Sequence, residues 1–187
     1  GERHNAGFHV INAIREDLGI LSQDFHSESL ISHISMGDSK VILVQPQTYM
    51  NLSGRAVISL ARFFHISPDK IVIIHDDLDL PLGRLLLKRN GGEGGHNGLL
   101  SISEALQTKN YPRLRFGIGR PTKIDTTVVD YVLNPPNPEE MELWKDQVQR
   151  SVAMVRCLCK EGLIQAMNRW NSRRLPSLKK EEPDDSI

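Results

Sequence analysis

The sequence predicts an α/β fold, a single domain with a mixed β-sheet flanked by helices. Two observations predict it: short strand patterns alternate with longer helical patterns, and one turn-linked strand pair indicates a hairpin. The 187 residues suit one domain, and 39% hydrophobic with 25% charged residues leaves enough apolar mass for a core. We therefore expect a domain over residues 1–172 and a polar, disordered tail over residues 173–187, which holds too few apolar residues to offset ordering.

The first third of the chain predicts a helix, a hairpin and a second helix. Apolar residues recur at spacings of three and four over residues 6–18, as on one face of a helix. Residues 30–35 and 40–45 have strand character on either side of a Gly-Asp-Ser turn, which predicts a β-hairpin. Another apolar stripe after Ser53, over residues 56–64, predicts the second helix.

The middle of the chain combines strands with a glycine-rich loop. Residues 70–75 hold a continuous apolar run that is too short for a helix and suits a strand buried on both faces. Residues 84–88 predict another strand, residues 91–98 a loop and residues 99–106 a helix. The carboxylates that follow the buried strand therefore stand at its C-terminal end, where α/β folds place their sites.

The last third of the predicted domain indicates two strands and one long helix. Residues 113–118 and 128–133 have the β-branched and aromatic character of strands. A cap at Asn137, with Glu140 three residues later, begins an amphipathic helix that continues to about Gly162. Strands and helices thus alternate to the end of the domain.

Charge and cysteine content limit the partners and the compartment. The 23 basic and 23 acidic residues balance, so any site for a polyanion must be a local patch. No apolar run approaches the roughly 18 residues that span a bilayer, so we expect no membrane partner. Cys157 and Cys159 stand two apart in a predicted helix, which argues against a disulfide or a metal pair. An intracellular, reducing compartment fits this pattern.

His4 and Asp76 are the two residues that could carry acid–base chemistry. His4 stands at a loop-to-helix junction, where a neutral imidazole with a pKa of about 6.5 could act as a general base. A surface or capping histidine is the alternative. Asp76 follows the buried strand and could hold an imidazole in one tautomer, or it could simply be a strand-end turn residue.

The acidic cluster and the glycine-rich loop invite cofactor sites that their spacing does not support. Asp76, Asp77 and Asp79 could bind magnesium. Alternation in an extended segment sends neighbouring side chains apart, and a turn follows, so we expect no metal. The loop over residues 91–98 lacks a P-loop ending and dinucleotide-binding spacing, so we expect no nucleotide cofactor. Its glycines either permit a bulky ligand to approach the backbone or form a flexible hairpin loop.

Basic residues on both sides of the loop could form a local phosphate-binding surface, with scattered solvated charges as the alternative. Asn51 and Asn97 carry amides that donate and accept together, which suits an ester or a ribose edge. As isolated asparagines they would more often be caps or turns. The basic residues are Arg84, Lys88, Arg89, Arg113, Arg115 and Arg120.

Five ordered motifs together resemble the bacterial-type peptidyl-tRNA hydrolase family. The resemblance spans Arg3 to Pro121 and implies a single α/β domain with a mixed sheet. Enzymes of that family hydrolyse the ester between a peptide and the ribose of the tRNA 3′ end, which returns tRNA to translation. The resemblance implies a monomer that uses no cofactor and acts on the acceptor stem and 3′ end of peptidyl-tRNA. The motifs are residues 3–8, 46–54, 75–83, 94–99 with Ser101, and 113–121.

By this resemblance His4 is the catalytic base, and Asp76 orients it and favours its basic form. General-base help of this kind contributes about 10²- to 10⁴-fold in rate. Arg89 and Arg115 fall where the family has basic residues that clamp the 5′ phosphate of the acceptor stem. Arg89 stands where a lysine is common, which keeps the charge but changes its geometry.

The resemblance also implies four substrate-binding residues. Asn51 and Asn97 match the family's substrate-binding asparagines, and their amides would hold the ester and its developing oxyanion. Tyr49 matches the aromatic residue beside them, and Met50 matches the wall of the peptide channel.

Two other functions remain open. Some relatives keep this fold as catalytically silent RNA-binding or splicing partners, and such a protein would retain tRNA or intron RNA with the ester intact. The presence of His4, Asp76, Asn51 and Asn97 weighs against this alternative. A metal-dependent hydrolase built on the acidic cluster would lose activity in a chelator.

Two departures from the family pattern concern the N-terminus. The family's opening strand and its Gly-Leu-Gly-Asn-Pro-Gly loop, with an active-site asparagine, should lie just before residue 1, and Glu2 replaces the usual threonine. We expect a fragment: as an entire product these residues would be poorly stable, with activity at risk, whereas the whole protein would be active. An N-terminal leader would decide between the cytoplasm and an organelle such as the mitochondrion, and the charged residues 179–187 are compatible with a eukaryotic organellar member.

Overall fold

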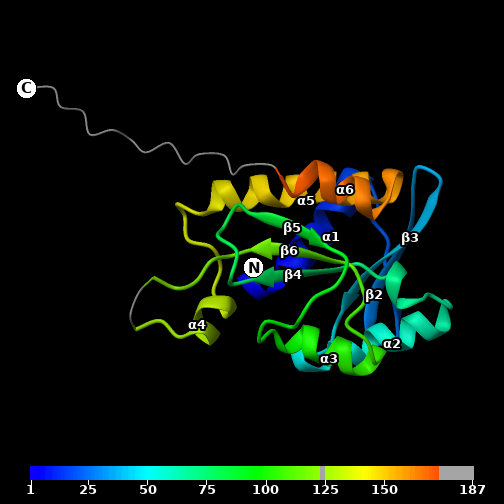
Figure 1. Cartoon of the computed structure of the whole chain (residues 1–187), viewed down its shortest axis with the longest axis horizontal. Helices are drawn as coiled ribbons and strands as arrows, with labels where there is room; N and C mark the ends of the chain where they lie inside the picture. Colours follow the sequence, from blue (N-terminus) through cyan, green and yellow to red (C-terminus); the bar gives the residue numbers. More distant parts are fainter. Residues whose placement is uncertain (123–124, 173–187) are drawn as a thin grey trace, which may run out of the picture.

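The computed structural model describes residues 1–122 and 125–172, which form two three-stranded sheets with helices on both sides (Figure 1). This arrangement confirms the predicted α/β class. The polar tail predicted over residues 173–187 lies outside the described residues.

The first sheet is an antiparallel meander in which each strand pairs with the next along the chain. Ser29 to Met36 pairs residue by residue with Pro46 to Ser39, which confirms the predicted hairpin. Gly37 in its turn has a φ of +59°, a backbone conformation that favours glycine. The strands are β1 (Asp24–His26), β2 (Ser29–Met36) and β3 (Ser39–Pro46).

The second sheet is mixed, because its central strand β6 runs parallel to β4 and antiparallel to β5. The predicted strand over residues 70–75 begins later, since Pro68–Lys70 forms a 3-10 turn, and it extends to Asp77. Asp76 therefore lies inside the paired region, opposite Phe116. The strands are β4 (Ile73–Asp77), β5 (Leu85–Lys88) and β6 (Arg113–Gly117).

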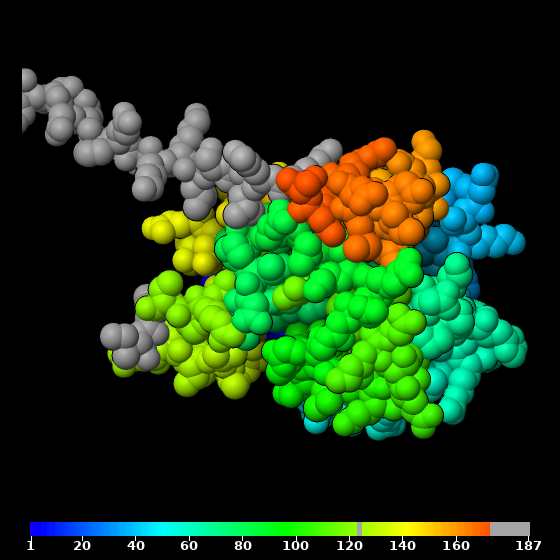
Figure 2. Space-filling view, in the orientation of Figure 1, coloured from blue at the N-terminus to red at the C-terminus, as the bar shows by residue number. Residues whose placement is uncertain are grey.

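Helices cover both faces of the second sheet. In Figure 1, α1, α5 and α6 lie on one side of it, and α2 and α3 lie together on the other. Figure 2 shows the orange residues of α6 packed against the green residues of the strand region, in agreement with the contacts between α6 and β5. The helices are α1 (Ala6–Asp17), α2 (Ser53–Phe63), α3 (Asn97–Leu106), α4 (Val128–Leu133), α5 (Met141–Glu161) and α6 (Leu163–Trp170).

Two apolar clusters hold these layers together. The larger joins α1, α5 and α6 to both sheets through fully or nearly fully buried side chains such as Ile14, Leu114 and Trp144. The smaller lies between α2, α3 and the sheet and includes Val57 and Ile102. Ile74 packs against the larger cluster and Ile73 against the smaller one, which accounts for the apolar run over residues 71–74 that leads into β4.

The strand predicted over residues 128–133 is wrong, because these residues form helix α4. The Thr127 hydroxyl accepts a hydrogen bond from the Asp130 backbone N–H at 3.1 Å, and this cap starts the helix. The β-branched valines favour a strand only weakly, and a capped turn that buries Val132 outweighs that preference.

An open cavity of about 1810 Å³ separates the edge of β3 from the edge of β4. Apolar side chains of β3, β4, α1 and α2 line most of it, among them Leu43, Ile73 and Leu60. The lining also includes polar residues, among them His4 and Asn97.

Replacement of Gly54 by alanine is expected to destabilise the protein. A Cβ at this position of α2 would lie 2.1 Å from the carbonyl oxygen of Ser101 in α3, so the two helices would have to separate. Overpacking of this kind costs about 1–3 kcal/mol in free energy of unfolding, measured by chemical denaturation. Arg55→Ala, at the neighbouring exposed position, is the control. Equal stability of the two variants would contradict the close approach of α2 and α3.

Candidate active site

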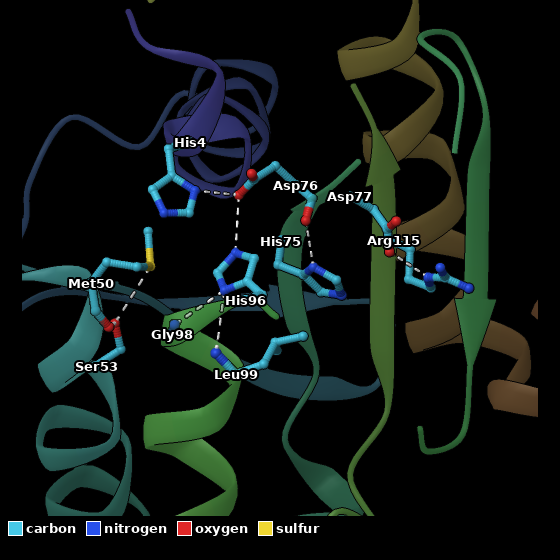
Figure 3. A network of polar contacts seen from close by, with 10 residues as sticks. All are labelled: His4, Met50, Ser53, His75, Asp76, Asp77, His96, Gly98, Leu99 and Arg115. Carbon is cyan, nitrogen blue, oxygen red and sulfur yellow. Dashed lines mark hydrogen bonds and ion pairs between the residues drawn. The ribbon is translucent and has the colours of Figure 1, made fainter. Parts of the chain in front are cut away.

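Two histidines meet one buried carboxylate at the C-terminal end of β4 (Figure 3). Asp76 Oδ1 lies 2.8 Å from His4 Nδ1 and 3.0 Å from His96 Nε2, and the Asp76 side chain is only 4% exposed. The centroids of the two imidazole rings are 5.0 Å apart. A single carboxylate oxygen thus accepts hydrogen bonds from both rings.

Strand β4 positions Asp76, and the turn before α1 positions His4. Asp76 is near the end of β4, which runs parallel to β6, so its carboxylate stands at the strand's C-terminal end. His4 lies in the 3-10 turn η1 (Arg3–Asn5), which leads into α1 on the face of β4. Gly7 permits this packing, because a Cβ there would lie 2.5 Å from the carbonyl oxygen of Ile74.

His96 caps helix α3 with its imidazole, and this cap determines its tautomer. Its Nδ1 accepts hydrogen bonds from the backbone N–H groups of Gly98 (3.1 Å) and Leu99 (3.3 Å). In the neutral ring the proton must therefore be on Nε2, which donates it to Asp76. The helix terminus and the carboxylate hold His96 in one orientation from opposite ends.

His4 has the opposite arrangement. Its Nδ1 donates to Asp76, so the lone pair of the neutral ring is on Nε2. The His4 side chain is 19% exposed and lines the cavity between β3 and β4. His4 therefore offers a proton acceptor to a molecule in that cavity.

Opposing effects act on the pKa values of this pair. Burial by itself lowers the pKa of His4, but the hydrogen bond and charge of Asp76, with a contribution from Glu2, raise it above the ordinary value of 6.5. Burial by itself raises the pKa of Asp76, but the hydrogen bonds and charges of His4 and His96 hold that pKa well below its usual range. Asp76 therefore stays ionised while His4 gains or loses its proton.

His75 is a neutral neighbour of this group. Its Nδ1 donates to the backbone carbonyl of Asp76 at 2.7 Å, and its ring centroid is 5.2 Å from that of His96. Burial, followed by the charge of His96, lowers the pKa of His75 to about 4. His75 thus adds no positive charge to the site at neutral pH.

The ligand atoms of His4, Asp76 and His96 lie within 4.8 Å of one another, close enough to suggest a metal site. The hydrogen bonds argue against this use. His96 Nε2 carries a proton, and moving that proton to Nδ1 would place it against the N–H groups of Gly98 and Leu99. The geometry favours a hydrogen-bonded relay over a metal centre.

The acidic cluster at the end of β4 is divided among different partners. Asp77 accepts hydrogen bonds from Arg115 (2.6 Å) and from the backbone of Asp79 (2.9 Å), and Asp79 pairs with Arg120 (2.6 Å). Burial by itself raises the pKa of Asp77, but the Arg115 hydrogen bond outweighs it and lowers that pKa. These carboxylates do not converge with Asp76 on a common point.

The four residues matched to substrate binding line the same cavity as His4 and Asp76. Met50 and Asn51 lie in the 3-10 turn η2 (Met50–Leu52) before α2, while Asn97 begins α3. The side chain of Tyr49 is 81% exposed, which leaves its ring available to a ligand. The packing of α2 on α3 thus brings both asparagines to one cavity wall.

The two arginines matched to phosphate binding lie elsewhere. Arg89 is exposed just after β5, and Arg115 lies on β6 with its Nε bound to Asp77. Neither lines the cavity that contains His4. The structure therefore separates these cations from the histidine–aspartate group and balances the charge of Arg115.

Known proteins resemble this chain in both sequence and structure. A protein-family profile described as "Peptidyl-tRNA hydrolase" matches residues 1–179. The chain belongs to the peptidyl-tRNA hydrolase family. Membership makes it an enzyme, a carboxylic ester hydrolase.

Bacterial members of the peptidyl-tRNA hydrolase family are similar over most of the chain. The peptidyl-tRNA hydrolase of Moorella thermoacetica is 46% identical over 170 residues, covering 90% of this chain and 89% of the relative. That of Symbiobacterium thermophilum is 43% identical over 172 residues, covering 91% and 90%. The crystal structure of the Acinetobacter baumannii peptidyl-tRNA hydrolase superimposes with a TM-score of 0.85 at 33% identity, covering 92% of this chain and 88% of that one.

Among the residues that the structure of this peptidyl-tRNA hydrolase family member describes, no helix is long and apolar enough to cross a bilayer. The relatives reported above come from bacteria, and nothing in the comparison indicates the organellar eukaryotic origin considered from the sequence.

His96 is the site residue whose role sequence reasoning did not anticipate. In the sequence His96 stands beside Asn97 in the glycine-rich loop over residues 91–98, and nothing there assigns it a contact. The predicted helix begins at residue 99, which would make Gly98 the cap, whereas α3 begins at Asn97 and is capped by His96. Imidazole is not a preferred cap, so propensity alone could not reveal that His96 caps α3 and binds Asp76.

Proposed function

We propose that this protein hydrolyses the ester between peptide and tRNA in peptidyl-tRNA, with His4 as general base and Asp76 as the residue that orients it. The observation that carries this proposal is the 2.8 Å hydrogen bond from His4 Nδ1 to Asp76, which leaves Nε2 as the proton acceptor in the cavity. Released tRNA would return to translation.

Each step follows from the protonation states above. His4 Nε2 removes a proton from a water molecule as its oxygen attacks the ester carbonyl carbon. The tetrahedral intermediate collapses with cleavage of the bond to the ribose oxygen, which takes the proton from His4. Asp76 stabilises the transient imidazolium without itself becoming protonated. The hydrogen bond from His96 keeps the Asp76 carboxylate ionised and in place.

The substrate-binding roles belong to the same proposal. The amides of Asn51 and Asn97 would hold the ester and donate to the oxyanion that develops on its carbonyl. Tyr49 would pack beside the 3′ end, and Met50 would form a wall of the peptide channel. All four residues line the cavity that contains His4, which supports the assignment.

Peptidyl-tRNA is the proposed partner, bound by its acceptor stem and 3′ end. Arg89 and Arg115 are proposed to bind the 5′ phosphate outside the catalytic cavity, Arg115 through its Nη groups because its Nε is bound to Asp77. We propose a monomer that needs no cofactor. Similarity to bacterial enzymes favours the cytoplasm.

Peptide release from N-blocked aminoacyl-tRNA is the experiment that tests this function. Because protonation of Nε2 removes the base, kcat/KM is expected to rise with pH through a pKa above 6.5 and then to level off. Below that pKa the rate should fall about tenfold per pH unit. Addition of a chelator should leave the rate unchanged.

The catalytically silent RNA-binding partner predicts another result. Such a protein would retain the tRNA in a filter-binding assay while the ester stays intact at every pH. That outcome would refute the hydrolase proposal, and loss of activity in the chelator would favour the metal-dependent alternative.

A further inference from the structure

Arg3 is a buried cation directly before His4 in the chain. Its side chain is 7% exposed, and it lies in η1, the 3-10 turn that carries His4. Burial of a guanidinium is costly unless hydrogen bonds and an opposite charge compensate for the lost water. The contacts of Arg3 therefore show which part of the fold its burial stabilises.

These contacts all go to one segment far along the chain. Arg3 Nη1 donates to the backbone carbonyls of Tyr131 (3.3 Å), Asn134 (3.1 Å) and Pro135 (2.7 Å). Its Nη2 lies 2.6 Å from Glu140 Oε2, and its backbone N–H donates to the Asn134 carbonyl at 3.1 Å. The guanidinium carbon is 4.2 Å from the centroid of the Tyr131 ring.

That segment is itself well anchored. The Tyr131 hydroxyl donates to the backbone carbonyl of Ile118 just beyond β6, at 2.6 Å. In the turn that leads into α5, the Glu140 N–H donates to Asn137 Oδ1 at 2.8 Å and the Asn137 N–H donates to Glu140 Oε2 at 2.9 Å. Arg3 thus ties η1 to a fixed support that reaches both the second sheet and the longest helix. In Figure 1, α4 lies beside the N-terminal residues.

We propose that Arg3 is a positioning residue for His4, holding η1 against residues 131–140 so that the imidazole stays within hydrogen-bonding distance of Asp76. The proposal rests on the proposed function, because it assumes that His4 is the base. Asp76 constrains the His4 ring, and Arg3 constrains the backbone that carries it. Both constraints are needed because a ring held at one atom can still pivot away from the substrate.

The test compares Arg3→Gln, Arg3→Lys and Arg169→Gln in steady-state peptide release. Arg169 is the matched control, since its ion pair with Glu161 is exposed and lies in α5 and α6. Arg3→Gln is expected to lower kcat about 100-fold with KM nearly unchanged, the size of loss expected from a small misplacement of a catalytic group. Arg3→Lys keeps the charge but not the planar fork, so its kcat should lie between the two.

A second readout separates positioning from folding. The His4 Nδ1–H resonance in ¹⁵N-resolved NMR reports the hydrogen bond to Asp76, and it should weaken in Arg3→Gln while the corresponding Nε2–H resonance of His96 persists. The groups that face His4 in the structure are Asp76, His96 and Glu2, so the acid limb of the pH profile should move toward pH 6.5 as the bond to Asp76 loosens.

Two results would overturn the proposal. One is a lower melting temperature for Arg3→Gln with an unchanged kcat well below that temperature, which would make Arg3 purely structural. The other is an unchanged His4 Nδ1–H resonance. The NMR result holds even if no peptide release is found, so failure of the hydrolase proposal and failure of the positioning proposal can be distinguished.

Discussion

Replacement of His4 by alanine is expected to lower kcat/KM for peptide release by about 10²- to 10⁴-fold, the usual contribution of a general base. The variant keeps the cavity and its asparagines, so KM should change little. The residual rate would come from water activated without a base, with the amides of Asn51 and Asn97 still available to the oxyanion. Initial rates with N-blocked aminoacyl-tRNA, measured at a pH on the plateau, give the comparison.

His26→Ala is the matched control for this substitution. His26 lies on β1, packs its ring at a tilt against Phe63 with a centroid distance of 4.3 Å, and does not line the cavity that contains His4. Its loss should leave kcat within a factor of about two, because it removes ring contacts with Phe63 and Phe64 and a 2.8 Å hydrogen bond to Ser27, none of which involves His4 or Asp76. A His4→Ala variant that is folded and retains the wild-type rate would rule out His4 as the base.

Replacement of Asp76 by asparagine is expected to reduce kcat on the order of 10⁴-fold, the loss typical of an aspartate that orients a catalytic histidine. If the amide oxygen faces the rings, the charge that stabilises the imidazolium is lost. If the amide nitrogen faces them, His4 must turn its proton to Nε2, and the base is blocked. Either orientation also removes an anionic partner of His96.

The pH profile of Asp76→Asn provides an independent check. The hydrogen bond and charge of Asp76 raise the pKa of His4, so their loss should move the acid limb to lower pH. Asp79→Asn is the control, because Asp79 lies three residues away and pairs only with the exposed Arg120 among its described ion pairs. Equal losses in the two variants would instead favour a function for the acidic cluster as a whole.

Much of the fold could be predicted because local patterns and tertiary packing agree. The spacing of apolar residues identified α1, α2 and the long α5, since each buries one face against a sheet or a neighbouring helix. The apolar run over residues 71–74 identified strand β4, whose Ile73 and Ile74 pack into different apolar clusters. Where local pattern and tertiary packing disagree, as in α4, the cap at Thr127 and the burial of Val132 favour the helix.

The candidate site was only partly visible in the sequence. Residue type and position make His4, Asp76, Asn51 and Asn97 candidates, motif resemblance assigns their roles, and all four line one cavity. The role of His96 depends on where α3 begins, and that of Arg3 depends on a segment more than 120 residues away. The pairing of Arg115 with Asp77 likewise follows from the register of β4 and β6.

The sequence by itself determined which chemical groups this protein has, its family motifs and the elements with clear periodicity. Tertiary structure alone decided the direction of each hydrogen bond: Asp76 accepts from two rings, His96 is held as the Nε2–H tautomer, and His4 keeps its lone pair on Nε2. The physical reason is that local propensity depends on neighbours in the chain. Protonation state and orientation depend instead on burial and on partners that only the packed fold brings within 3 Å.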